Sequence, residues 1–393
     1  MRIGIHNEPG STLGGSECMV AMIAAALRDS YSVEIIHHHA DLTLSALSEF
    51  SGAPLEHVKL RYVEPKRPAS SATRLPWRMY AEARDFFAEL SSPYDVFITV
   101  THGIPPFCHA PIGVLFVLFP IGNRWETWPR TAEHETGPLR RRLRAGYHDW
   151  EWSRRMAGYQ TKLAISEFTG RWTRNYWGID CDVLYPPVDT GFAAGAKTNT
   201  ILSVGRFAKM KKHEVMLRAF AALGDARSDG WRYRCFGSLG PSSAERSYFE
   251  SLRTLSAESG ADLTENVSRD CLVAAYEHAR IFWHAAGHGE SEDQQPIKAE
   301  HFGLVTVEAM AAGAVPVVAN RGGQREIVEH GVSGYLWDTP DELVSYTRRL
   351  MTDETLRSEM SAAARRRAQH FSRGRFADRF SQLIVERIGR GKS

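Results

Sequence analysis

The chain has 393 residues, of which 43% are hydrophobic and 24% are charged, and its formal net charge is +2. A chain of this length is expected to form two domains, because a single hydrophobic core rarely grows beyond about 250–300 residues. The near balance of charge argues against a dedicated nucleic-acid-binding protein, which usually carries a strong basic excess. We therefore expect no nucleic-acid partner.

Five cysteines are scattered singly along the chain, so neither a disulfide framework nor a paired-cysteine metal site is expected. Such usage is typical of proteins kept in a reducing cytosol. The first residues, Met1 to His6, predict a strand and not the basic start and apolar core of a signal peptide. No apolar run approaches the ~18 residues of a membrane-spanning helix. The sequence therefore predicts a cytoplasmic protein.

The first half of the chain alternates predicted strands with predicted helices. Gly14 and Gly15 form a loop after the first strand, ahead of a helix for which Ser16 is the expected N-cap. Strand–helix alternation of this kind indicates a parallel sheet with right-handed crossovers. The predicted strands of this half are 3–5, 33–37, 95–100, 113–119 and 163–166.

The pattern restarts after a break at Tyr185 to Asp189, where paired prolines and small residues indicate a linker. We place the domain boundary near residue 188, which gives domains of 1–187 and 188–370 and a C-terminal segment of 371–393. Residues 341–388 are predicted to be helical. The predicted strands of this half are 200–204, 233–237, 281–285 and 315–319.

The most informative stretch is a predicted helix, 304–312, which Gly303 precedes and Gly313 ends. The first N–H groups of a helix lack partners and carry partial positive charge, so this helix start suits a phosphate. Glu300 precedes the helix, and Glu308 lies one turn into it. A phosphate seat flanked by two carboxylates can hold a nucleotide sugar. Two glutamates at this spacing are also common on solvated surfaces, which is the plainer interpretation.

A second glycine-rich turn follows the predicted strand 315–319. With this turn included, the run from Glu300 to Leu336 resembles the signature of the family 4 (group 1) retaining glycosyltransferases of the GT-B superfamily. The pattern is long and specific, because it combines the two glutamates, the helix, the strand and the glycines in one order. Its later members are Gly322, Gly323, Glu326, Gly331 and Gly334.

The resemblance implies an α/β protein with the GT-B fold, in which two Rossmann-like domains face each other across a cleft. The 1–187 domain would take the acceptor side, and the 188–370 domain would bind the nucleotide-sugar donor. The segment 371–393 would form a helix that crosses back onto the first domain.

The same resemblance implies roles for the residues around the helix start. Glu300 would lie near the hydroxyl groups of the donor sugar, and Glu308 would bind the ribose. The backbone N–H groups of Phe302, Gly303 and Leu304 would face the diphosphate.

Arg206 and Lys211 follow the predicted strand 200–204 and resemble a second segment of the same family. Two cations at the end of a strand can neutralise a diphosphate leaving group, and no metal-ligand cluster is recognisable in the sequence to do so. The alternative is a pair of surface cations at a helix start, where the helix dipole disfavours them. Lys212 is a rival to Lys211, and Lys209 is a weaker one.

Two features of the first half gain a role from the resemblance. Gly14 and Gly15 resemble the family's N-terminal glycine loop, although a plain strand–helix turn has the same pattern. His102 ends a predicted strand, where the family places a histidine beside the donor sugar; a structural histidine is the alternative. The consecutive residues His37–His39 cannot all bind one metal ion, because successive residues of a strand point to opposite faces.

The segment 139–155 is rich in arginine and aromatic residues. It could lie on an anionic membrane surface, which would make the protein peripheral, or it could bind an acceptor phosphate. A solvated helix that covers the edge of the domain is the third interpretation. The loop 287–299 is expected to be mobile and to lie at the mouth of the cleft, with no role assigned.

Together these features predict an enzyme, a hexosyltransferase-type glycosyltransferase that moves a sugar from a nucleoside-diphosphate sugar to an acceptor hydroxyl with retention. The leaving diphosphate would help to deprotonate the acceptor, and no metal or other cofactor is expected. A non-catalytic nucleotide-sugar-binding protein is the main alternative. A phosphorylase-like enzyme would need a pyridoxal-phosphate lysine, for which no segment is recognisable. The residues with expected catalytic roles are Glu300, His102, Arg206 and Lys211.

Overall fold

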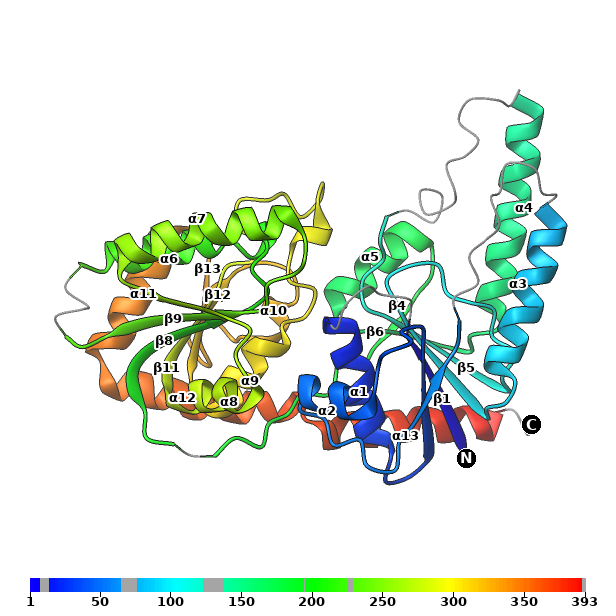
Figure 1. Cartoon of the computed structure of the whole chain (residues 1–393), viewed down its shortest axis with the longest axis horizontal. Helices are drawn as coiled ribbons and strands as arrows, with labels where there is room; N and C mark the ends of the chain where they lie inside the picture. The colour runs from blue at the N-terminus through cyan, green and yellow to red at the C-terminus, as the bar shows by residue number, and fades with distance from the viewer. Residues whose placement is uncertain (8–13, 65–75, 123–137, 194, 225–228, 391–393) are drawn as a thin grey trace. The chain divides into compact units, whose positions relative to one another are not determined.

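The structure is a computed structural model that describes residues 1–7, 14–64, 76–122, 138–193, 195–224 and 229–390. The chain divides into two compact units. Met1–Pro186 and Phe376–Ser393 form the N-terminal unit, and Pro187–Arg375 form the C-terminal unit. Each unit contains one sheet flanked by helices (Figure 1).

The sheet of the N-terminal unit has seven parallel strands in the order β3-β2-β1-β4-β5-β6-β7. Its central strands are buried along nearly their whole length, because helices cover both faces of a parallel sheet. The strands are β1 (Arg2–Asn7), β2 (Ser32–His37), β3 (Lys59–Tyr62), β4 (Val96–Thr101), β5 (Ile112–Val117), β6 (Thr161–Ala164) and β7 (Asp182–Val183). The helices are α1 (Gly15–Leu27), α2 (Leu44–Ser51), α3 (Pro76–Ser91), α4 (Pro138–Ala157), α5 (Glu167–Trp177) and α13 (Arg373–Arg390).

The sheet of the C-terminal unit has six parallel strands in the order β10-β9-β8-β11-β12-β13. Its core is aromatic, with Phe207, Tyr233 and Trp283 fully buried. The strands are β8 (Thr198–Val204), β9 (Arg232–Gly237), β10 (Asp262–Glu265), β11 (Ala279–His284), β12 (Val315–Ala319) and β13 (Tyr335–Trp337). The helices are α6 (His213–Ala222), α7 (Ser243–Ser259), α8 (Arg269–His278), α9 (Leu304–Ala312), α10 (Gln324–Ile327), α11 (Pro340–Thr352) and α12 (Glu354–Ala368).

The start of α1 differs from the prediction, because Gly14 and not Ser16 is its N-cap. The carboxylate of Glu17 accepts the Gly14 N–H at 2.9 Å and the Asn7 side-chain amide at 3.1 Å. The buried N3 glutamate therefore bonds back to the N–H of the N-cap residue, while Gly14 has no side chain to accept the N–H groups of the first turn. Ser16 instead donates its own hydroxyl to Glu17 at 2.9 Å.

The C-terminal helix α13 packs mainly with the N-terminal unit, as the resemblance implied. The Phe376 ring lies 6.2 Å from that of Phe116, and the Tyr31 hydroxyl donates to Ser381 at 3.2 Å. Just before this helix, the Val188 N–H donates to Phe371 O at 2.9 Å. The two segments of chain that connect the units are therefore tied together at Val188.

No helix in the described ranges is long and apolar enough to cross a membrane. Among the same residues, no group of three or more His, Cys, Asp or Glu side chains is placed to hold a metal ion. Of the three consecutive histidines, His38 pairs instead with His6, and their Nε2 atoms lie 3.0 Å apart.

We expect Phe376→Ala to lower the free energy of unfolding of the N-terminal unit by about 3–5 kcal/mol, because it empties a buried site between Phe116 and Phe380. Val385 is 66% exposed on the same helix, so Val385→Ala is the matched control and should leave stability nearly unchanged. Urea unfolding curves of the two variants measure the difference. Equal effects would show that α13 does not depend on this contact.

Candidate functional site

Glu300 is the centre of a cluster of polar side chains in the C-terminal unit. Its Oε2 atom accepts a hydrogen bond from Lys211 Nζ at 2.5 Å and lies 3.0 Å from His284 Nε2. Lys211 follows β8, and His284 ends the neighbouring strand β11. Parallel strands end at the same edge of their sheet, so this edge brings together residues that are far apart in the sequence. The structure thus unites two of the predicted site residues, Glu300 and Lys211.

The charge state of Glu300 follows from its neighbours. Burial alone would raise its pKa, but the Lys211 ammonium and the His284 ring hold the pKa well below its usual range. Burial lowers the pKa of His284, and the Glu300 carboxylate offsets that effect only in part. At neutral pH the cluster therefore contains a carboxylate, an ammonium and a neutral imidazole. Within the described residues, the second carboxylate oxygen, Oε1, has no hydrogen-bond partner and can accept one.

His284 is a member of the cluster that the sequence analysis missed. It is 4% exposed, and its Nε2 contact with Glu300 is close without being aligned as a hydrogen bond. On its other side, the Gln324 amide nitrogen lies 3.4 Å from His284 Nδ1 and donates to Thr306 Oγ1 at 3.0 Å. His284 therefore connects Glu300 to the first turn of α9. A signal was present, since a histidine lies next to the end of the predicted apolar strand 281–285, ahead of the motif.

The glycines after β12 support the backbone that carries Glu300. The Gly323 N–H donates to the Glu300 carbonyl at 2.8 Å. A Cβ atom at Gly322 would lie 2.1 Å from that carbonyl oxygen, and one at Gly323 would lie 2.5 Å from the His301 carbonyl oxygen. Gly322 also has a left-handed φ of 56°, which favours glycine for a second reason. The two glycines are required for this close approach of backbones.

The helix α9 begins as predicted, at Leu304, with Gly303 as its N-cap, and it ends at Gly313. Gly303 has a φ of 123°, and a Cβ atom there would lie 2.7 Å from Gln324 Nε2. The side chain of Phe302 is buried against Phe371, with ring centroids 5.5 Å apart. Phe302 therefore contributes its side chain to the core.

Glu308 belongs to a different set of contacts from Glu300. It is 8% exposed, and its Oε1 accepts from Arg269 Nη2 at 3.0 Å while its Oε2 accepts from the Tyr276 hydroxyl at 2.9 Å. Both partners lie on α8, and neither was singled out from the sequence. The two glutamates of the motif are thus held by two separate clusters, which α9 connects.

Arg206 follows β8 but does not join Glu300. Its side chain is 55% exposed, and Nε lies 3.5 Å from Glu245 Oε1 at the start of α7. Of the two rival lysines, Lys212 pairs with Glu290 at 2.6 Å, and Lys209 is exposed. Lys211 is the lysine that contacts Glu300.

Two glutamates fix the segment 287–299 to its surroundings. Glu290 pairs with Lys212 at 2.6 Å and with Lys298 at 2.9 Å. Glu292 accepts the Gly322 N–H at 2.6 Å and pairs with Arg325 at 3.0 Å. The segment that we expected to be a mobile loop is therefore tied at one point to the lysine next to Lys211 and at another to the glycine turn.

The remaining predicted site residues lie in the N-terminal unit. Gly14 caps α1, and a Cβ atom at Gly15 would meet no atom within 4 Å. The residues just before them, 8–13, lie outside the described part of the chain. His102 follows β4, is half-buried, and its Nδ1 lies 3.2 Å from Phe119 O.

The segment 139–155 forms most of α4 and has two kinds of side chain. Trp152 is buried against Trp177 with ring centroids 5.7 Å apart, and Arg155 pairs with Glu151 at 2.6 Å. Trp150 is 43% exposed, with the Arg154 guanidinium 5.8 Å from its ring. The structure describes only the backbone of Arg140, Arg141, Arg142 and Arg144, as part of α4.

The family model for "Glycosyl transferases group 1" matches residues 191–367, which is most of the C-terminal unit and includes both glutamate clusters. The C-terminal unit therefore carries a domain of this family. The match confirms the family predicted from the run between Glu300 and Leu336.

The chain is similar to two curated glycosyltransferases, each over about half of its length. The chain is 29% identical over 254 residues to "GDP-Man:Man(3)GlcNAc(2)-PP-Dol alpha-1,2-mannosyltransferase" of Dictyostelium discoideum, covering 58% of this chain and 48% of that protein. It is 32% identical over 204 residues to "D-inositol 3-phosphate glycosyltransferase" of Thermobispora bispora, covering 50% and 45%. The chain therefore spans about half the length of these relatives.

Solved structures resemble this chain over nearly its whole length. Anabaena Alr3699/HepE in complex with UDP and glucose has a TM-score of 0.67 at 17% identity, covering 98% of this chain and 100% of that chain. WaaG, a glycosyltransferase involved in lipopolysaccharide biosynthesis, has a TM-score of 0.62 at 13% identity, covering 97% and 99%. At these identities the likeness concerns the fold, and it confirms the predicted GT-B fold.

We expect Gly322→Ala to destabilise the C-terminal unit more than Gly331→Ala. Both glycines have a left-handed φ, 56° and 77°, which costs an alanine about 1–2 kcal/mol. A methyl group at Gly331 enters open space, whereas one at Gly322 would lie 2.1 Å from the Glu300 carbonyl oxygen. The difference in urea unfolding free energy between the variants thus isolates the clash, and a difference near zero would contradict the close approach.

Proposed function

We propose that this protein is a retaining glycosyltransferase that moves a sugar from a nucleoside-diphosphate sugar to an acceptor hydroxyl. The observation that carries the proposal is the Glu300–Lys211–His284 cluster, which stands at the carboxyl edge of a Rossmann-like sheet beside the start of α9. In open α/β sheets, ligands bind outside the carboxyl ends of the strands. Membership of group 1 and the fold support the same reaction class.

The C-terminal unit supplies the groups that such a donor needs. The first N–H groups of α9, together with those of Phe302 and Gly303, would seat the diphosphate. Glu300 would accept a hydrogen bond from a sugar hydroxyl on Oε1, because Oε2 is already held by Lys211. His284 would act as a positioning residue that keeps the carboxylate in place without adding charge.

During transfer, the bond between the anomeric carbon and the diphosphate oxygen breaks, and a bond from the acceptor oxygen to the anomeric carbon forms on the same face. The acceptor proton passes to the leaving phosphate oxygen. Negative charge therefore develops on the diphosphate, and Lys211 and Arg206 would stabilise it. Because these cations belong to the chain, we propose no metal and no cofactor other than the donor.

Glu308 can bind the ribose without giving up its present partners. Each carboxylate oxygen has two lone pairs, and the bonds from Arg269 and Tyr276 use one on each oxygen. A ribose hydroxyl could therefore donate to Glu308 as a third partner. Arg269 and Tyr276 would then be positioning residues that hold the carboxylate toward the nucleoside.

The N-terminal unit would take the acceptor side of the reaction. Through the family resemblance, Gly14 and Gly15 would approach the donor, and His102 would lie by the transferred sugar. The contact of His102 Nδ1 with Phe119 O at 3.2 Å holds the ring in place just after β4. The 1–187 and 188–370 domains would thus divide acceptor and donor between them, with 371–393 returning to the first.

We also propose that α4 brings the protein to an anionic surface as a peripheral, cytoplasmic enzyme. The exposed pair of Trp150 and Arg154 combines an amphipathic ring with a cation, which suits the interface of a membrane with acidic lipids. An acceptor that carries a phosphate would engage the same pair. The names of the two relatives state different acceptors, and only the first name states a donor.

Lys211→Ala should lower transfer turnover by about 10²–10³-fold, because it removes one stabilising charge from the developing diphosphate. Lys209 is exposed and two residues away, so Lys209→Ala is the matched control and should keep full turnover. Donor-sugar transfer and hydrolysis assays follow a thermal-shift screen against UDP-, GDP-, ADP- and TDP-sugars. Donor binding without transfer or hydrolysis would instead favour the non-catalytic nucleotide-sugar-binding protein.

Glu300→Gln and Glu308→Gln should have different effects on nucleoside diphosphate binding. Glu308→Gln should weaken both the free nucleoside diphosphate and the donor, because both contain the ribose. Glu300→Gln should leave nucleoside diphosphate affinity nearly unchanged and reduce transfer, because its partner is the sugar. Calorimetry on both variants decides the question. Equal weakening, or weakening in Glu300→Gln alone, would mean that the two carboxylates are assigned to the wrong parts of the donor.

A further inference from the structure

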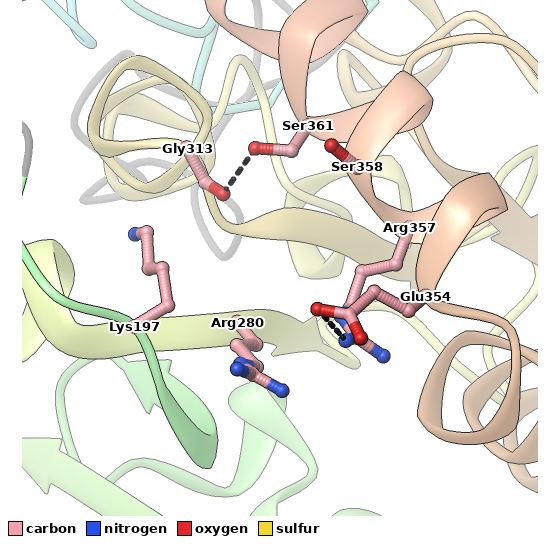
Figure 2. Close-up of a pocket in the computed structure, with 7 residues that line it drawn as sticks. All are labelled: Lys197, Arg280, Gly313, Glu354, Arg357, Ser358 and Ser361. Carbon is pink, nitrogen blue, oxygen red and sulfur yellow. Dashed lines mark hydrogen bonds and ion pairs between the residues drawn. The ribbon is translucent and has the colours of Figure 1, made fainter.

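A second polar site lies at the opposite end of the strands of the same sheet, where β8 and β11 begin. A cavity of about 160 Å³ opens there between Lys197, just before β8, Arg280, at the start of β11, and Arg357 on α12 (Figure 2). Glu354 and Ser358 stand at its rim. The strand β11 separates this cavity from the Glu300 cluster, since Arg280 and His284 are four residues apart and each residue of a strand rises about 3.3 Å. The cavity is therefore distinct from the candidate donor site.

The cations around the cavity outnumber the acids. Lys197, Arg280 and Arg357 face a single carboxylate, Glu354, whose side chain is 83% exposed. Glu354 Oε1 lies 3.7 Å from Arg357 Nη2, and an exposed pair of this kind compensates little charge. The cavity thus combines a positive field with partial exclusion of water.

Hydrogen bonds within the protein use all the N–H donors of Lys197 but only some of those of Arg280 and Arg357. Lys197 Nζ donates to the carbonyl oxygens of Tyr276, Ala279 and Ala312 at 3.3, 2.9 and 2.7 Å, so all its donors are used and only its charge faces the cavity. Arg280 donates one bond, to Asn199 Oδ1 at 2.8 Å. Arg357 donates from one nitrogen, Nη1, to backbone oxygens on α11.

A guanidinium has five N–H donors, so both arginines retain donors beyond those bonds. Ser358 is exposed at the rim, and its hydroxyl has no partner among the described residues. Two guanidinium groups and a hydroxyl around a small cavity form a donor set that suits a tetrahedral oxyanion, because arginine binds phosphate oxygens in pairs.

The positive groups also repel one another. Burial and the neighbouring Arg365 guanidinium lower the pKa of Lys197 to about 7. Burial and the nearby Arg280 lower the pKa of Arg357. An anion in the cavity would relieve this repulsion. The cavity volume of about 160 Å³ is well above the roughly 10–15 Å³ that one water requires, so the cavity can admit a phosphate group.

We propose that this cavity binds a phosphate group, either as inorganic phosphate or as the phosphate of a small monoester, through Arg280, Arg357 and the Ser358 hydroxyl. The site is independent of the proposed transfer reaction, because none of its residues belongs to the Glu300 or Glu308 clusters. It adds a second anion-binding position to the donor domain.

Calorimetric titrations at constant ionic strength test the proposal with two probes, inorganic phosphate and glycerol 3-phosphate. Ser358→Asp should raise the dissociation constant by about tenfold or more, because it places a carboxylate at the rim. Arg280→Gln should weaken binding as well. Ser358 is exposed, so Ser358→Asp is expected to fold, and thermal unfolding checks this directly.

Two control variants make the outcome decisive. Arg246→Gln removes an exposed arginine from α7 and should leave binding unchanged. Lys211→Ala alters the candidate donor site and should also leave binding unchanged. Tighter binding of glycerol 3-phosphate would identify a monoester as the ligand, and tighter binding of inorganic phosphate would identify the free anion. Loss of binding in Lys211→Ala but not in Ser358→Asp would overturn the proposal, as would the absence of saturable binding in the wild type.

Discussion

The ion pair between Lys211 and Glu300 is the contact on which the candidate site depends. It joins two segments that are 89 residues apart, and it does so at the edge where the adjacent strands β8 and β11 both end. Removing a carboxylate from water is costly unless a cation and further polar groups accompany it. The sheet meets this requirement because Lys211 follows β8 and His284 ends the adjacent strand β11. A neutral His284 adds a polar neighbour without a second full charge.

The backbone around this pair is shaped to leave room for it. Gly322 and Gly323 let a second loop approach the Glu300 carbonyl more closely than any side chain would allow. Glu292 holds that glycine turn through the Gly322 N–H, and Glu290 holds the lysine next to Lys211. Backbone contacts and ion pairs therefore fix the same few atoms from several directions. A site built in this way is organised before a ligand arrives, which is how electrostatic stabilisation becomes effective.

Helix α9 connects three polar regions of the C-terminal unit. Its start lies beside Glu300, its second turn carries Glu308, and its last carbonyl groups accept from Lys197 and Arg365 near the cavity. The cations at its end satisfy carbonyl groups that have no partner within a helix and oppose the negative end of its dipole. The net charge of the whole chain is small, but cations lie at both ends of the strands of this one sheet.

Local sequence determined the inner strands, the start and end of α9 and the glycines at its approach, because apolar runs and glycine positions act over a few residues. The edge strands β3 and β10 escaped prediction, since one side of an edge strand is exposed and its residues are not a continuous apolar run. The sequence also predicted Glu300 and Lys211 as site residues. Only the tertiary structure decided that Lys211 and not Lys212 meets Glu300, that His284 joins them, and that Glu308 is held by Arg269 and Tyr276. These pairings depend on which strand ends and helices become neighbours, and no local pattern records that.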